Sequence, residues 1–162
     1  MDCECVIEEF GSLGGQVADL LECGSRNITI SIYNLDQPEL NEVFVTTIDA
    51  EANFATPAFP TGTYSILVKV DGYLAILYSD LIIESGSNVL DISGLIFGDL
   101  NNTNNINILD VSVMCSAFGS TLGDANYMAI ADLNCDGFIN LLDFSLLNVH
   151  FGSVGDNPPT ME

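Results

Sequence analysis

The sequence has very little positive charge. Arg26 and Lys69 are its only basic residues, and with 23 Asp and Glu they leave a formal net charge of −21. This balance argues against binding to nucleic acid or to an anionic membrane surface, because both would repel the chain. Bound divalent cations would relieve the self-repulsion, so we expect them to stabilise the fold.

The sequence also lacks the residues that catalysis needs. General acid–base or nucleophilic chemistry requires a base oriented beside a nucleophile. The single histidine, His150, falls near the end of a predicted helix and is expected to be an exposed or capping residue. We therefore predict that the protein is not an enzyme. No apolar run is long enough to span a bilayer, so membrane insertion is not expected.

The five cysteines are an odd number, which leaves one thiol unpaired or available to another molecule. Cys115 and Cys135 would meet if the C-terminal third folds back on itself. Cys3 or Cys5 with Cys23 would fasten the N-terminal segment to the next domain. None of the five has the spacing of a zinc site.

The most informative stretch is residues 132–143, which place oxygen-bearing side chains at alternate positions. A calcium ion takes six or more oxygen ligands, and a 12-residue loop supplies them at positions 1, 3, 5, 7, 9 and 12. Gly137 at position 6 permits the left-handed turn. The alternative is a solvated Asp/Asn-rich turn. The predicted ligands are Asp132, Asn134, Asp136, the carbonyl of Phe138, Asn140 (directly or through water) and Asp143.

A second copy of this pattern begins 33 residues upstream, which indicates an internal duplication. Thr103 replaces the carboxylate at position 5 and Asn104 replaces the glycine, although Asn tolerates the left-handed conformation. We expect weaker calcium binding here, with a calcium-free structural turn as the alternative. Ile139, at position 8 of the downstream copy, is expected to anchor the two copies to each other. The upstream candidate ligands are Asp99, Asn101, Thr103, Asn105, Asn107 and Asp110.

Two loops of the form D-x-N-x-D-G-x-I-N-x-x-D, each followed by a short helix, resemble a type I dockerin over about residues 98–153. This resemblance implies two calcium ions, a pseudo-twofold pair of loop–helix units and docking onto a cohesin domain. Family members carry recognition residues at loop positions 10 and 11. This chain has apolar pairs there, which suit either a partner interface or burial against its own other domain: Ile108, Leu109, Leu141 and Leu142.

Upstream of the loops, the pattern changes to short apolar alternations. Ile28, Ile30 and Ile32 are predicted to share one face of a strand. Further strands are expected at 43–48, 54–56, 63–70, 74–78, 81–83 and 89–92, with Tyr64, Ile66, Val68 and Val70 facing inward. About seven short strands favour a β-sandwich. The turns around Pro60-Thr61-Gly62 and Asp71-Gly72 resemble the carboxypeptidase-regulatory-like or transthyretin-like sandwich family over about residues 26–94.

We therefore predict a mainly β protein with a small α part. Its domains are an N-terminal arm or first strands (1–25), an Ig/transthyretin-like β-sandwich (26–94), a dockerin-like pair of calcium loop–helix units (95–154) and a tail (155–162). The first segment either pairs within the chain or completes a neighbour's sheet by strand addition.

Calcium sites of this kind belong where calcium is abundant, so we expect an extracellular or cell-surface protein. Residues 1–5 lack a signal peptide, so either the start is processed or truncated or the protein is cytosolic, and the calcium argument favours the first. Asn27 begins an N-x-T glycosylation motif. The predicted function is a non-catalytic calcium-binding subunit of a fibre or surface assembly made of copies of itself. The alternative is an adaptor that binds a cohesin domain on a separate scaffold.

Overall fold

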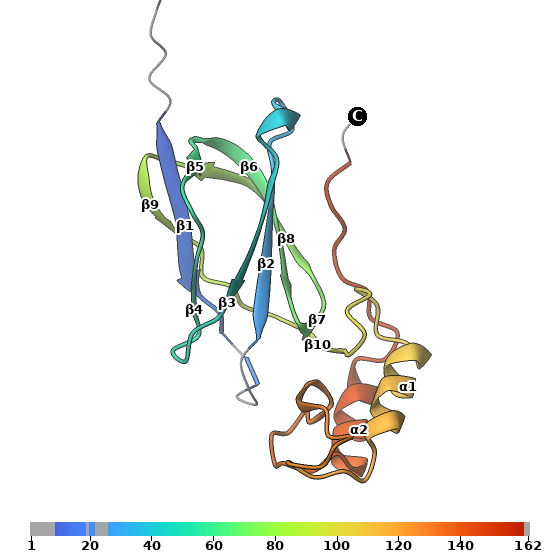
Figure 1. The fold of residues 1–162 in the computed structure, drawn as a ribbon. Helices are drawn as coiled ribbons and strands as arrows, with labels where there is room; N and C mark the ends of the chain where they lie inside the picture. Colours follow the sequence, from blue (N-terminus) through green and yellow to red (C-terminus); the bar gives the residue numbers. More distant parts are fainter. Residues whose placement is uncertain (1–8, 19, 22–25, 161–162) are drawn as a thin grey trace, which may run out of the picture.

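The computed structural model describes residues 9–18, 20–21 and 26–160. Its described part consists of a β-sandwich followed by a two-helix module, which confirms the predicted fold class (Figure 1). The strands are β1 (Phe10–Gln16), β2 (Asn27–Tyr33), β3 (Glu42–Thr47), β4 (Asn53–Ala55), β5 (Phe59–Pro60), β6 (Gly62–Val70), β7 (Gly72–Tyr73), β8 (Ile76–Ile83), β9 (Gly86–Val89) and β10 (Phe97–Asp99).

Two sheets form the layers of the sandwich (Figure 1). One has the antiparallel order β3-β2-β6-β8. The other is built on β1, which pairs antiparallel with β4 and β5 and parallel with β9. Residues 10–16 therefore pair within their own sandwich, so the intramolecular alternative holds for this part of the N-terminal segment. Residues 1–8, which belong to the same prediction, lie outside the described part.

The predicted alternation places the core residues correctly. Ile28, Ile30 and Ile32 are fully buried between the two layers. Phe59 packs edge-on against Tyr64 with ring centroids 5.4 Å apart. Because a strand turns successive side chains to opposite faces, these residues reach the same interior from both sheets. The inward residues of β6 are at most 1% exposed: Tyr64, Ile66, Val68 and Val70.

One strand prediction was wrong. The stretches 74–78 and 81–83 are not separate strands, because β8 runs without interruption from Ile76 to Ile83. Asp80 has a positive φ of 56°, and the register against β6 shifts between Tyr64 and Ile66. A bulge of this kind absorbs an extra residue while pairing continues on both sides. β9 also ends earlier than predicted, at Val89.

The helical module contains α1 (Ile108–Ala117) and α2 (Leu141–Val149), with short 3-10 turns at Pro38–Leu40 in the sandwich and Ala129–Ala131 in the module. No helix in the described ranges has the length and apolar character needed to cross a membrane. The module has its own apolar core, formed by Leu100, Met114, Ala117, Ala131, Leu133, Ile139 and Leu147.

The sandwich and the module are joined through β10. This strand pairs antiparallel with β7, at the end of the sandwich nearest the helices (Figure 1). Phe97 packs against the cores of both parts and lies edge-on to His150, with ring centroids 4.8 Å apart. His150 is the C-cap residue of α2, in agreement with the capping role expected from the sequence.

The chain then returns to the sandwich after α2. The N–H of Asp156 donates to the carbonyl of Ala75 at 2.9 Å, and the carboxylate of Asp156 accepts the N–H of Leu77 at 2.9 Å. Figure 1 shows the tail beside β8. The predicted tail therefore begins as a segment that fastens the module to the sandwich.

Candidate metal centre and docking surface

Residues 99–110 are here called the first loop and residues 132–143 the second loop. In the second loop, the position 1 carboxylate of Asp132 accepts the N–H groups of Asp136 and Gly137 at 3.2 and 2.9 Å. Cys135 and Gly137 have φ values of 60° and 82°. These left-handed residues turn the backbone so that consecutive N–H groups point at one carboxylate.

The first loop repeats this geometry with different residues. Asp99 accepts the N–H groups of Thr103 and Asn104, both at 2.8 Å. Asn102 and Asn104 take the left-handed conformation at 55° and 65°. The duplication seen in the sequence therefore extends to the backbone conformation, including position 6, where asparagine replaces glycine.

The carboxylates at position 12 connect the start of each loop to the start of its helix. Asp143 is fully buried, and it accepts the N–H groups of Leu133 at 2.8 Å, Asn134 at 3.3 Å and Asn140 at 2.8 Å. Asp110 is also fully buried. It accepts the N–H groups of Asn101 at 3.1 Å and Asn107 at 2.8 Å.

The asparagines at position 9 act as helix caps. The amide oxygen of Asn140 accepts the N–H of Leu142 at 2.8 Å, and that of Asn107 accepts the N–H of Leu109 at 2.8 Å. Each forms a capping box with the aspartate at position 12. Such caps satisfy N–H groups that have no partner within a helix. Because the amide oxygen of Asn140 is engaged in this cap, we expect Asn140 to reach calcium through a water molecule, which is one of the two predicted modes.

The side chains at positions 3 and 5 contact each other. The amide nitrogen of Asn134 donates to Asp136 at 2.9 Å, and in the first loop the hydroxyl of Thr103 donates to Asn101 at 2.6 Å. The described residues contain no close group of three His, Cys, Asp or Glu side chains arranged to hold a metal. The donors in the second loop are nevertheless three carboxylates, amide oxygens and carbonyls, which is the chemistry that calcium prefers.

Tyr127 also belongs to this site, although it was not predicted from the sequence. Its hydroxyl donates to Asp132 at 2.6 Å. Burial, the hydrogen bond to Asp132 and the charges of Asp132, Asp143 and Asp136 raise the pKa of Tyr127 to about 12. The phenol is therefore a neutral donor at physiological pH. It lies five residues before the loop, where no motif position predicts a contact.

The two units are joined by a reciprocal pairing, in agreement with the anchoring role expected of Ile139. The carbonyl of Ile139 accepts the N–H of Gly119 at 2.7 Å, and its N–H donates to the carbonyl of Ser120 at 3.0 Å, just after α1. Ile106 makes the equivalent bonds to Gly152 and Ser153, after α2, at 2.8 and 2.9 Å. Each loop is thus anchored to the end of the other unit's helix, in a pseudo-twofold arrangement.

The cysteine pairing expected within the module was wrong. Cys135 is disulfide-bonded, whereas Cys115 is a free, exposed thiol on α1. The second loop is therefore held covalently at position 4, through the disulfide bond of Cys135. The pairing expected among Cys3, Cys5 and Cys23 falls outside the described residues.

The first loop is attached to the sandwich by two side chains at its left-handed positions. The amide oxygen of Asn102 accepts the N–H of Gly72 at 2.9 Å, and that of Asn104 accepts the N–H of Ala75 at 2.7 Å. The amide nitrogen of Asn104 also donates to the carbonyl of Asp156 at 2.7 Å. Position 6 thus carries a side chain that glycine lacks, and this side chain joins the loop, the sandwich and the tail.

We expect Asn104→Gly to loosen the module from the sandwich while the loop conformation is kept, because glycine adopts the same φ. Each lost hydrogen bond contributes about 1 kcal/mol, so the free energy of unfolding should fall by about 1–2 kcal/mol. Hydrogen exchange at the Ala75 amide should accelerate. Gly137→Asn, at position 6 of the second loop, is the matched control and should leave Ala75 protected. Unchanged protection of Ala75 in Asn104→Gly would contradict this role.

The four apolar residues at positions 10 and 11 are exposed to solvent. Ile108 and Leu109 are 64% and 57% exposed, and Leu141 and Leu142 are 67% and 59% exposed. Burial against the chain's own sandwich, one of the two alternatives, does not occur. These pairs start α1 and α2 at equivalent points of the duplication. The side chain of Asn27, the predicted glycosylation site, is exposed and donates to Asp71 at 3.1 Å, and its modification stays a prediction.

Together, the fold and the loops define a protein with a sandwich and a duplicated module of calcium-type loops. Residues 97–151 match the model of the dockerin type I domain, in agreement with the span of about 98–153 expected from the sequence. This match covers about a third of the chain. Dockerin type I domains bind calcium, which supports Ca²⁺ as the ion of this module.

Two solved structures resemble most of the chain. A crystal structure of a type II cohesin–X-dockerin complex from Acetivibrio cellulolyticus, mutated at its C-terminal interface, is 23% identical with a TM-score of 0.65, covering 89% of this chain and 97% of that chain. An N-terminal interface mutant of the complex gives the same values. At this identity the likeness establishes the fold. It supports a sandwich before the dockerin module and leaves the transthyretin-like detail unconfirmed.

A structure of a type II cohesin–dockerin domain from Bacteroides cellolosolvens is 37% identical, with a TM-score of 0.32 and coverage of 37% of this chain and 90% of that chain. The search of curated proteins gave no match.

Proposed function

We propose that this chain is a non-catalytic adaptor whose dockerin module, stabilised by calcium, docks onto a cohesin-type domain. The observation that carries this proposal is the repeated exposed apolar pair at the starts of α1 and α2, on a module that matches the dockerin type I family. The solved structures with the same fold come from cohesin–X-dockerin complexes. Large exposed apolar side chains gathered on one module are typical of a protein interface.

The proposed domain division follows the sequence prediction, with the sandwich ending near residue 94, the module spanning 95–154 and a tail from 155. The transthyretin-like relationship of the sandwich remains part of this proposal. Cohesin–dockerin systems assemble outside cells or on their surfaces, which supports an extracellular or cell-surface location. The sparse basic charge supports a protein partner over nucleic acid.

Two calcium ions are proposed, with the stronger site in the second loop. Its ligands would be Asp132, Asn134, Asp136, the carbonyl of Phe138, Asp143 and a water held by Asn140. Three carboxylates in a short loop attract a divalent cation more strongly than the two that remain in the first loop. The first loop would bind through Asp99, Asn101, Thr103, Asn105, Asn107 and Asp110.

A second candidate function is self-assembly into a fibre or surface layer. The observation that favours it is β3, an edge strand with exposed Val43 and Val45. An exposed apolar edge strand is a template for pairing with another chain. Self-assembly by strand addition cannot use residues 10–16, because these residues form β1 and already pair within their own sandwich.

Sedimentation velocity of the full chain, in millimolar calcium and in excess chelator, separates the two functions. For an adaptor we expect a monomer in both conditions and a heavier species when a matching cohesin is added with calcium. Large assemblies of the chain alone that disappear with chelator would establish self-assembly instead. A panel of type I and type II cohesins from which none shifts the monomer would overturn the adaptor proposal.

A further inference from the structure

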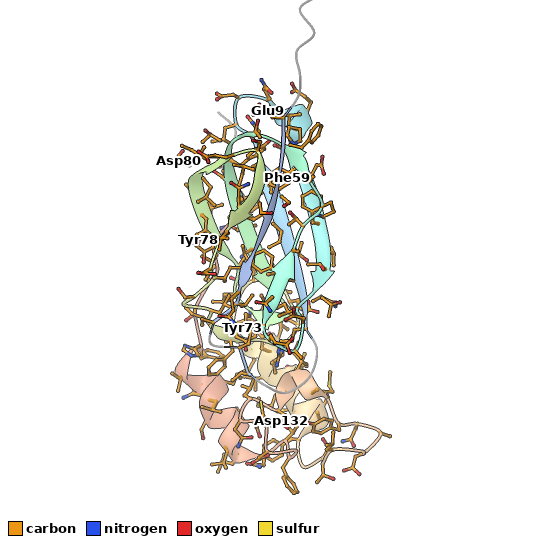
Figure 2. The ribbon with its side chains drawn as sticks, turned by 90° about the vertical axis from the view of Figure 1, so that its left-hand side faces the viewer. Glu9, Phe59, Tyr73, Tyr78, Asp80 and Asp132 are labelled. Carbon is orange, nitrogen blue, oxygen red and sulfur yellow. The ribbon has the colours of Figure 1, made fainter. Side chains whose placement is uncertain are left out.

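Lys69, one of the two basic residues of the chain, lies against the first loop. It belongs to β6 of the sandwich, and its ammonium group forms an ion pair with Asp99 at 3.0 Å. The ammonium also donates to the amide oxygen of Asn102 at 3.0 Å, to the carbonyl of Val70 at 3.2 Å and to the carbonyl of Tyr73. Oxygen atoms of both the sandwich and the module thus surround the Lys69 ammonium. Figure 2 shows Tyr73 at the end of the sandwich next to the module.

Both charged groups of the Lys69–Asp99 ion pair are largely shielded from water. Asp99 has no exposed side-chain surface, and the side chain of Lys69 is 20% exposed. A charge taken out of water needs a partner, and Asp99 would otherwise have only backbone N–H donors. The interaction between such charges is stronger than at an open surface because water screens it less.

The second loop offers a direct comparison. In both loops the position 1 carboxylate accepts the N–H groups of positions 5 and 6, and the oxygen that accepts the position 6 N–H is also approached by a side-chain donor. In the second loop this donor is the neutral hydroxyl of Tyr127, from within the module. In the first loop it is the ammonium of Lys69, from the sandwich. The carboxylates of Asp99 and Asp110 carry −2 and the Lys69 ammonium offsets one of these charges, whereas the three carboxylates of the second loop carry −3.

We propose that Lys69 is a built-in counter-ion that lowers the calcium affinity of the first loop and joins this loop to the sandwich. A calcium ion in the first loop would share the Asp99 carboxylate with this ammonium, and two cations on one carboxylate repel each other. Calcium binding to the first loop and its attachment to the sandwich therefore oppose each other. The inference rests on the proposed calcium-binding function and adds the residue that sets the difference between the two sites.

Two backbone amides of the sandwich report on its attachment to the first loop. The N–H groups of Gly72 and Ala75 donate to Asn102 and Asn104 of the first loop. These bonds depend on how the loop lies against the sandwich. If calcium displaces Lys69 from Asp99, hydrogen exchange at both amides should become faster.

Calorimetric titration with calcium chloride tests the affinity part, using the full chain, Lys69→Met and Lys69→Arg. The wild-type chain should show one tight and one weak site. Lys69→Met removes the cation but keeps a long side chain, so the weak-site affinity should rise at least about tenfold. Lys69→Arg keeps the charge and should stay weak. An unchanged or lower weak-site affinity in Lys69→Met, or an equal gain in Lys69→Arg, would overturn the proposal.

Hydrogen exchange of the wild-type chain tests the attachment part and needs no variant, so the proposal stays testable if Lys69→Met folds poorly. Gly72 and Ala75 should be protected in chelator and at calcium levels that fill only the tight site. They should exchange faster as the weak site fills. Protection that stays constant or increases across the second step would overturn the proposal.

A failure of the proposed function gives a different result. In that case no tight site is found, or no cohesin binds. The effect of Lys69→Met is measured on the weak site alone, and in an Asp132→Ala background it is observed without the second loop. A Lys69 effect with no cohesin binding would retain this inference and reject the adaptor.

Discussion

Asp143→Ala is expected to abolish the stabilisation that calcium gives to this protein through the second loop. The carboxylate is fully buried and accepts three backbone N–H groups, so its removal also leaves these donors without their partner. Hydrogen bonds to a charged group contribute about 1.5–3 kcal/mol each, so we expect the free energy of unfolding in chelator to fall by at least about 3 kcal/mol. Thermal unfolding with and without calcium measures both effects.

Asp110→Ala is the matched control, because Asp110 holds the same position in the first loop and accepts two N–H groups. It should lower stability in chelator by a similar mechanism. With free calcium at 100 times the dissociation constant of the second loop, binding adds about 2.7 kcal/mol to the stability of the native state. This gain should persist in Asp110→Ala and be absent in Asp143→Ala. Equal calcium-dependent shifts in the two variants would reject the stronger second site.

Should Asp143→Ala fail to fold, Asp143→Asn keeps the volume and one acceptor oxygen while removing the charge. It should fold in chelator and still lose most of the calcium-dependent shift, because calcium prefers carboxylate oxygens in such loops. A full shift in Asp143→Asn would show that this carboxylate is not a calcium ligand.

The second large effect is expected at the apolar pairs. Burying a leucine side chain fully contributes about 1.5–3 kcal/mol, so the double variant Leu141→Ser, Leu142→Ser should weaken cohesin binding by about 3–5 kcal/mol. This loss corresponds to a dissociation constant raised by about two to four orders of magnitude. Binding calorimetry against a cohesin that retains the wild-type chain measures it.

The double variant Ile108→Ser, Leu109→Ser probes the equivalent pair on α1, because the two helices are related by the duplication. Val89→Ser is the control, since Val89 is also an exposed apolar residue but lies in β9 of the sandwich, away from the module. Its affinity should match that of the wild-type chain. If both double variants, and the quadruple variant, bind as tightly as Val89→Ser, the partner surface lies elsewhere.

Much of the site could be predicted from the sequence because its main determinants are local. Although the capping role of Asn107 and Asn140 was found only in the structure, the alternate oxygen-bearing residues and the left-handed position 6 act within a dozen residues of each other. The same is true of β2, where strict alternation placed Ile28, Ile30 and Ile32 in the core. A period of two or a fixed loop spacing leaves the backbone few alternatives, so the pattern and the structure agree.

The wrong predictions concern contacts between distant segments. Cys135 was paired with Cys115, which is a free thiol. The break predicted between 78 and 81 is a bulge, because β6 provides a partner on both sides of Asp80. Local pattern carries no information about which distant backbone lies opposite, so these points required the fold.

The sequence by itself determined that this protein has a sandwich and a duplicated pair of calcium-type loops, and that the second loop has more carboxylates. Only the tertiary structure decided that the two loops differ in their surroundings. Lys69 reaches Asp99 from 30 residues away in the chain, and Asn104 bonds Ala75 across the junction. The physical reason is that ligand spacing is a property of contiguous residues, whereas a counter-ion acts through space and is set by how the two parts pack.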